Sequence, residues 1–227
     1  MKRTLLALAL LAGLLATACG RAPSPGAEAE ELVDKARWTV DAFKQRKTPQ
    51  TTLFRDLMAK AEGVVVFPSA YRAGFVVGAE YGSGVMLARQ PSGGWSAPAF
   101  YTMGAGSIGL QIGGQVAETI LIARTQKAVQ ALVKHQGKLG ADLGITVGTV
   151  GGGMEGAVTT NLGADVVVFS YAAGLYAGGS LEGSVLARRN DYNEAYYGPG
   201  ATPDAILFGQ TFSNPQADPL RQVLAAP

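Results

Sequence analysis

Histidine and cysteine are nearly absent from this chain, which contains one of each, His135 and Cys19. A zinc site needs three or four such ligands, so we expect no metal site. A serine–histidine–aspartate triad would have to use His135. That residue lies where a helical pattern ends, close to Lys134 and Lys138, which is typical of an exposed histidine in a last helical turn. These shortages argue against an enzyme.

Acidic residues are also sparse in the glycine-rich part of the chain. They are Glu80, Glu118, Asp142, Glu155, Asp165 and Glu182. None forms a closely spaced pair, and we interpret them as residues on the solvated face of strands. A pair assembled only in space, as in a glycosidase, stays open as a hydrolase alternative.

Two glycine-rich motifs invite a nucleotide-binding interpretation that their context does not support. "GAGSIG" at 104–109 needs a helix after it to hold a pyrophosphate, but the following residues alternate as a strand. "GTVGGGMEG" at 148–156 lacks the lysine and hydroxyl residue of a phosphate loop. We therefore expect no cofactor.

An excess of charge is lacking as well. Without Lys2 and Arg3, the chain has 17 basic and 17 acidic residues. A general nucleic-acid-binding protein is basic, so we expect no nucleic acid partner.

The N-terminus reads as an export signal followed by a lipid anchor. Two basic residues precede an uncharged stretch of 15 residues, which is too short for a membrane-spanning helix. The small residues "ATA" come just before Cys19, as in a bacterial lipobox. We predict a signal peptide at 1–18, acylation of Cys19, and a lipidated tether at 19–26. Because Gly20 follows the cysteine instead of an acidic residue, we expect attachment to the bacterial outer membrane, with the domain in the periplasm.

The next segment, 27–61, has the periodicity of helices and carries a local excess of positive charge. Its apolar residues recur at helical spacing, and Pro49 separates two helices. The basic residues proposed to contact lipid headgroups are Lys35, Arg37, Lys44, Arg46, Lys47, Arg55 and Lys60. A solvated helix face is the alternative for them. Trp38 lies off the apolar stripe and is a candidate for an interfacial contact, or for packing under a neighbouring segment.

Glycine is abundant in the following segment, 63–189, which reads as β-strands. The chain has 31 glycines in 227 residues, about twice the usual ~7%. The phrase "GFVVGAEYGSGVMLAR" from Gly74 recurs as "GLYAGGSLEGSVLARR" from Gly174, each after "VVVF". We predict two related meanders that pair into an antiparallel β-barrel-like or sandwich body, giving an α+β fold. Short helices at 190–209 and a flexible tail at 210–227 complete the chain.

Six blocks in order resemble the SYLF domain. They are "AEGVVVFPSAYRAGFVVGAEYGSGVMLAR", "GGWSAPAFYTMGAGSIGLQIGGQ", "LGADLGITVG", "VVVFSYAAGLYAGGSLEGSVLARR", "NEAYYG" and "ILFG". The resemblance covers about 53–209, within one predicted domain at 27–209. It implies a non-enzymatic domain that binds phosphoinositides and other anionic lipids, and in some eukaryotic members actin. Lipid binding by a basic N-terminal helix is what the resemblance implies, but its residues do not transfer one by one.

The sequence therefore predicts a membrane-anchored lipoprotein that binds anionic or phosphoinositide-type headgroups. Weak attraction suffices for such a protein, because tethering raises the local concentration of headgroups. The alternative is a periplasmic protein-interaction or envelope-scaffold module, with a homo-oligomer or an envelope protein as its partner and no lipid selectivity.

Overall fold

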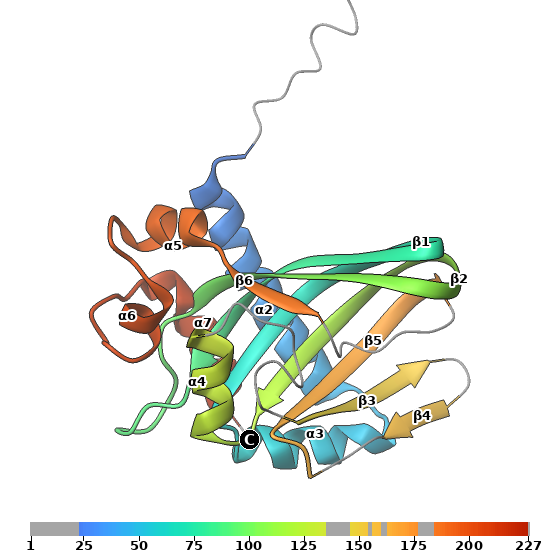
Figure 1. The fold of residues 1–227 in the computed structure, drawn as a ribbon. Helices are drawn as coiled ribbons and strands as arrows, with labels where there is room; N and C mark the ends of the chain where they lie inside the picture. Colours follow the sequence, from blue (N-terminus) through green and yellow to red (C-terminus); the bar gives the residue numbers. More distant parts are fainter. Residues whose placement is uncertain (1–22, 135–145, 154–155, 160–162, 177–183, 227) are drawn as a thin grey trace, which may run out of the picture.

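The computed structural model describes residues 23–134, 146–153, 156–159, 163–176 and 184–226, and it has an α+β fold (Figure 1). The helices are α2 (Pro25–Gln45), α3 (Pro49–Ala59), α4 (Gln126–Lys134), α5 (Asn190–Tyr197), α6 (Pro203–Leu207), the short 3-10 helix η2 (Pro215–Ala217) and α7 (Asp218–Ala225). The strands are β1 (Gly63–Ala88), β2 (Ala99–Ala123), β3 (Val147–Gly153), β4 (Gly156–Thr159), β5 (Val166–Tyr176) and β6 (Val185–Arg188). The predicted order of N-terminal helices followed by a β-body is confirmed.

The strands form one six-stranded sheet in the order β1-β2-β5-β3-β4, with β6 also paired to β2. All pairs are antiparallel except β3 with β5, which are parallel. The sheet is open but strongly curled, so the body is barrel-like without closing. Curling removes part of the exposed edge that a flat sheet of this size would present.

Strand β1 folds back on itself near its middle. The backbone amide of Arg89 donates to the carbonyl of Glu62 at 2.8 Å, so the two ends of the strand lie together. A side chain at Gly84 would overlap the carbonyl oxygen of Val66, and one at Gly82 would lie 2.9 Å from that of Ser69. These glycines let the two halves of β1 approach closely. The predicted strand–turn–strand meander is thus one continuous, sharply bent strand.

The two copies of the repeated phrase flank the same strand. Val64–Phe67 of the first copy pairs with Thr119–Ile122 of β2, and Val166–Phe169 of the second copy pairs with Ile120–Ala123 on the opposite edge. Later in each copy, β1 and β6 again lie on either side of β2, where both pair with residues 101–104. The repeat therefore supplies both neighbours of the central strand.

Alternate residues of the strands feed two cores on opposite faces of the sheet. Ile120 and Ile122 face the core covered by α2, α3, α5 and α7, whereas Leu121 and Ala123 face the core covered by α4 and α6. Helix α2 is held on the first face by a stripe of buried residues, which are Ala29, Leu32, Val33, Ala36, Val40 and Phe43. Ser24 caps its first turn by accepting from the backbone amide of Ala27.

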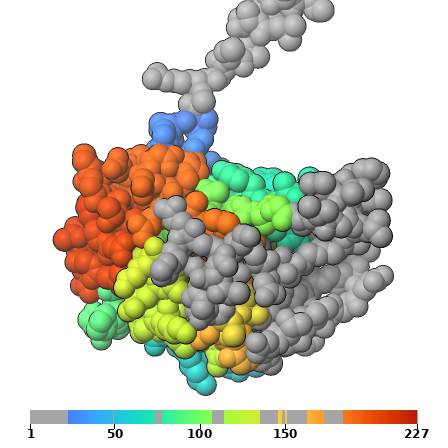
Figure 2. Space-filling model, in the orientation of Figure 1, coloured from blue at the N-terminus to red at the C-terminus, as the bar shows by residue number. Residues whose placement is uncertain are grey.

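The C-terminal segment differs from the flexible tail expected at 210–227. Helix α7 packs against α2 and buries Leu220 and Leu224. In Figure 2 the C-terminal elements, orange to red, gather on one side of the molecule, below the start of α2. Pro215 and Pro219 of this segment occupy the first turns of η2 and α7, where a missing backbone N–H costs nothing.

None of the described helices is both long enough and apolar enough to cross a bilayer.

Candidate functional site

Lys44, one of the seven basic residues predicted to contact lipid, is buried at the end of α2. Its ammonium group donates to the carbonyl oxygens of Val223, at 2.7 Å, and Ala226. Burial, followed by the nearby Arg55 charge, lowers the pKa of Lys44 below its ordinary value. The residue fastens the last turn of α7 and does not reach solvent as a headgroup ligand.

Arg46 is likewise engaged inside the domain. Its guanidinium forms an ion pair with Glu118 of β2 and lies 4.0 Å from the ring centre of Tyr171 on β5. The Tyr171 hydroxyl in turn contacts the Thr48 hydroxyl at 2.8 Å. These contacts hold the α2–α3 junction on the sheet, so Arg46 serves a structural role there.

The outward face of α2 is acidic, contrary to the basic helix expected for this region. It exposes Glu30, Glu31 and Asp34, while Lys35 forms a 2.7 Å ion pair with Glu31. Trp38 is 59% exposed on this helix, and the Arg37 guanidinium stacks 3.9 Å from its ring centre. Trp38 is therefore an exposed aromatic residue on an acidic helix face, and packing under a neighbouring described segment is excluded.

Four of the seven predicted residues are exposed, and the three other than Lys35 lie between the α2–α3 loop and the end of α3. These three are Lys47, Arg55 and Lys60, which we call the α3 basic surface. Arg55 donates through Nε to the carbonyl of Lys44 at 3.1 Å, capping the end of α2. The side chains of Lys47 and Lys60 make no hydrogen bond or ion pair within the described part of the chain. One exposed acid, Asp56, lies among them, so the surface has a net positive charge.

The acids considered for a hydrolase do not converge among the residues that the structure describes. Glu80 pairs with Arg72, and Glu118 pairs with Arg46. Asp165 accepts from the backbone amide of Thr146 at 3.0 Å and from its hydroxyl at 2.9 Å, and these bonds lower the pKa of Asp165. Asp142, Glu155 and Glu182 lie outside the described residues. Each described acid thus has its own structural partner.

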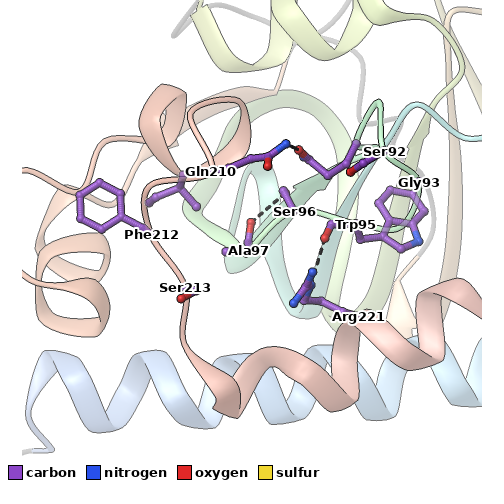
Figure 3. Close-up of a pocket in the computed structure, with 11 residues that line it drawn as sticks. Ser92, Gly93, Trp95, Ser96, Ala97, Gln210, Phe212, Ser213 and Arg221 are labelled. Carbon is purple, nitrogen blue, oxygen red and sulfur yellow. Dashed lines mark hydrogen bonds between the residues drawn. The ribbon is translucent and has the colours of Figure 1, made fainter.

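A small pocket of about 180 Å³ lies between the β1–β2 loop and the C-terminal segment (Figure 3). Arg221 donates to the Trp95 carbonyl at 3.0 Å, and Gln210 donates to Gln90 at 2.7 Å, so its polar groups already bond to one another. Ligand pockets usually measure about 300–1,000 Å³. The pocket is thus too small and too internally satisfied for a drug-sized ligand.

The remaining predicted motifs have clear placements. The "GAGSIG" residues lie inside β2, which continues as a strand to Ala123, as the sequence predicted. No group of three metal-ligating side chains occurs within the described ranges. His135, Cys19, the signal peptide and most of the tether lie outside the described residues.

The structure also exposes apolar residues that the sequence did not single out. Tyr71 and Val116 are 57% and 40% exposed and pair across β1 and β2, and Tyr81 is 54% exposed. The sequence around these residues has the ordinary alternation of a strand. That alternation does not reveal whether a helix covers the strand, and no described helix covers this end of the sheet.

Comparison with known proteins supports a family assignment. The profile described as Ysc84, Las17-binding protein actin regulator, matches residues 104–227. That description is of a binding and regulatory protein. Human SH3 domain-containing YSC84-like protein 1 is 36% identical over 180 residues, which cover 79% of this chain and 52% of the human protein.

Fungal relatives match over a similar range. SH3 domain-containing protein PJ696.02 of Schizosaccharomyces pombe is 34% identical over 184 residues, covering 80% of this chain and 43% of that protein. LAS seventeen-binding protein 3 of Saccharomyces cerevisiae is 33% identical over 172 residues, covering 74% and 37%. The chain spans about half the length, or less, of the curated relatives it matches.

Proposed function

The chain belongs to the Ysc84 family, the SYLF-domain family that its sequence resembles, and from that membership we propose that it is a non-enzymatic, membrane-anchored binding domain for anionic lipid headgroups. Acylated Cys19 would hold it at the outer membrane, with the domain in the periplasm. The α3 basic surface would contact the phosphates of the lipids, including those of phosphoinositide type.

The observation that supports this proposal is that the fold engages some of the basic residues in internal contacts and leaves others without them. Lys44 and Arg46 are engaged inside the domain, and Lys35 is paired with Glu31. The side chains of Lys47 and Lys60 have no such partners within the described structure, and they lie just before and just after α3, which carries Arg55. Positive side chains without internal partners are the ones available to an external anion.

The expected attraction is modest and depends on salt. A basic residue near an anionic membrane contributes about 1 kcal/mol, so three give a weak attraction. Tethering strengthens its effect, and excess lipid makes it measurable in an untethered fragment. Because exposed charges are screened over about 10 Å at 0.1 M ionic strength, binding should weaken as salt rises.

A protein-interaction module is the second candidate, and the exposed Trp38 favours it. Tryptophan is enriched among the residues that dominate binding at protein interfaces. The acidic residues around Trp38 suit a partner segment that carries lysine or arginine. The relatives' names refer to Las17 and actin regulation, which are also protein interactions. This candidate predicts a discrete protein partner and no lipid selectivity.

Co-sedimentation with vesicles tests the lipid proposal. The fragment Gly20–Pro227, which keeps every described element, is mixed with vesicles of neutral, anionic or phosphoinositide-containing composition at rising salt. We expect binding that needs anionic lipid and weakens with salt. The double variant Lys47→Glu with Lys60→Glu should bind about 30-fold more weakly, since each removed contact is worth about 1 kcal/mol.

The matched control carries Lys35→Glu and Lys134→Glu, which change charge equally at exposed positions away from the α3 basic surface. It should bind nearly as well as the unaltered fragment. Equal losses in both variants would mean that only net charge matters, and absence of binding to every vesicle would refute the proposal and leave the protein-interaction candidate.

A further inference from the structure

The end of the sheet farthest from the β1–β2 loop is formed by residues 71–81 of β1 and 104–116 of β2, which we call the folded-back end (Figure 1). Both strands bend there: Gly74 pairs with Gly113 and Gly78 with Ser107, and the register of the pairing breaks between Phe75 and Val77. The bend brings Arg72 and Glu80 together, with Arg72 Nε 3.0 Å from the Glu80 carboxylate. The folded-back end is therefore a ribbon of two strands doubled over an internal ion pair.

Charge is absent from the folded-back end outside that pair. The side chains of Arg72 and Glu80 are only 14% and 7% exposed, and their charges cancel. By sequence, no charged residue lies between them in β1, and none lies between Ala99 and Ala117 of β2. An end without net charge loses little electrostatic solvation in an apolar environment.

Tyr71 and Tyr81 lie at the same distance from the bend of β1. Tyr71 precedes Arg72 and Tyr81 follows Glu80, and the ion pair between Arg72 and Glu80 holds the two positions level with each other. Because side chains alternate between the faces of a strand, and Arg72 and Glu80 point inward, Tyr71 and Tyr81 point outward. They are 57% and 54% exposed.

The outer face of this end continues the face that α2 and α3 cover nearer the β1–β2 loop. Along β2, Ile120 and Ile122 are buried under those helices, and Glu118 contacts Arg46 at their edge. Val116, two residues farther, is 40% exposed beside Tyr71. Beyond Glu118, no described helix covers this face. Tyr71 and Val116 thus lie on a part of this face that no described helix covers.

We propose that the folded-back end inserts into the interfacial layer of a lipid bilayer, with Tyr71 and Tyr81 at the headgroup level. Tyrosine suits that position because its ring is apolar and its hydroxyl remains hydrated. The bilayer fits better than a polar partner because the end offers no net charge. The inference rests on the proposed function, and adds an apolar contact to the electrostatic one of the α3 basic surface.

Site-specific labelling tests the insertion. Cys19 is the only cysteine, so the fragment Gly20–Pro227 has none, and a single cysteine can be placed at will. Tyr71→Cys and Tyr81→Cys would each carry an environment-sensitive fluorophore (NBD), and the control label would sit at Ser92→Cys in the exposed β1–β2 loop. On adding anionic vesicles, we expect a blue shift and a severalfold rise in emission at positions 71 and 81, with quenching by brominated acyl chains, and no change at position 92.

Co-sedimentation of the same samples separates the two proposals. Sedimentation with vesicles without a change at positions 71 and 81 would overturn insertion while the headgroup proposal stands. The emission change at positions 71 and 81 can also be measured in the Lys47→Glu, Lys60→Glu double variant. If the change persists there and the affinity for vesicles is unaltered, insertion is supported and the role of the α3 basic surface is overturned. No sedimentation at all would overturn both.

An unlabelled variant provides a second readout. Tyr71→Ser with Tyr81→Ser should reduce vesicle binding by at least about tenfold, because both outward rings are lost. Phe208→Ser, at a 41% exposed residue after α6, should leave binding unchanged. Emission changes that depend on protein concentration without vesicles would indicate self-association through this end and overturn the bilayer as its occupant.

Discussion

Two tyrosines of the β-body and its neighbouring helix differ in what their hydroxyl groups contact. The Tyr101 hydroxyl is buried and has no hydrogen-bond partner among the described residues. The Tyr197 hydroxyl donates to the carbonyl of Pro98 at 2.7 Å. Burial raises the pKa of both tyrosines well above the ordinary value of 10. Removing each hydroxyl therefore has a different structural consequence.

We predict that Tyr101→Phe leaves the free energy of unfolding unchanged or slightly higher, since it removes an unpaired buried hydroxyl. Tyr197→Phe should lower it by about 1–3 kcal/mol, because the Pro98 carbonyl loses its donor. Urea unfolding at pH 7 measures both. A cost for Tyr101→Phe equal to that of Tyr197→Phe would show that the Tyr101 hydroxyl has an essential partner.

The raised pKa values of Tyr101 and Tyr197 also determine how the free energy of unfolding changes at alkaline pH. In the unfolded chain these tyrosines release their protons near pH 10, whereas in the folded protein they retain them to higher pH. The unfolded state then binds fewer protons, so stability is fully present below pH 10 and falls as pH rises above it. Tyr101→Phe should make this fall shallower in urea titrations between pH 9 and 11, and an unchanged slope would contradict the assignment.

At the scale of elements, the bend of β1 depends on glycines where its two halves cross. Gly84 faces the carbonyl of Val66 and the ring of Phe67, so a methyl group there has no room. Gly114 of β2 has open space at the same position of its Cβ. The two glycines lie in paired strands of one sheet and differ mainly in this close approach.

Alanine at these positions should therefore have opposite effects. Gly84→Ala should destabilise the fold by about 1–3 kcal/mol or more, since the strand halves must separate. Gly114→Ala should be neutral or mildly stabilising, because alanine loses less backbone entropy on folding than glycine. Thermal unfolding of both variants tests this, and similar melting temperatures would mean that the halves of β1 are not closely packed.

At the scale of the whole molecule, the first and last described helices, α2 and α7, pack against each other. Helix α7 buries Leu220 and Leu224 against α2, and Lys44 of α2 holds its last carbonyls. Helix α5 also packs on α2, where the Tyr192 hydroxyl donates to Glu28. The N-terminal helix thus depends on the C-terminal segment for much of its buried surface.

Ending the chain after Gln210 should accordingly weaken the whole domain. Two buried leucines are lost, each worth about 1.5–3 kcal/mol, and Lys44 loses its acceptors. We expect the free energy of unfolding to fall by at least about 3 kcal/mol in urea titration. Gln222→Ala, at an exposed position of α7, is the control and should change little. An unaffected truncated chain would contradict the packing of α7.

Much of this architecture could be predicted because it depends on the pattern of apolar residues within short segments of the sequence. The helical stripe from Ala29 to Phe43, the strand character of Val64–Phe67 and its repetition at Val166–Phe169, and the strand after Gly109 each follow from residue periodicity. Those patterns depend only on which neighbours along the chain share a face, so the sequence alone reveals them.

The sequence by itself determined the α+β class, the repeated strands and the shortage of residues for metal or triad chemistry. Only the tertiary structure decided which basic residues remain available and which apolar residues remain open. Lys44 and Lys47 are alike in sequence, yet one is buried under α7, 179 residues away, and the other faces solvent. The partner that covers a side chain comes from a distant segment, and no local pattern of charge or periodicity records where that segment will lie.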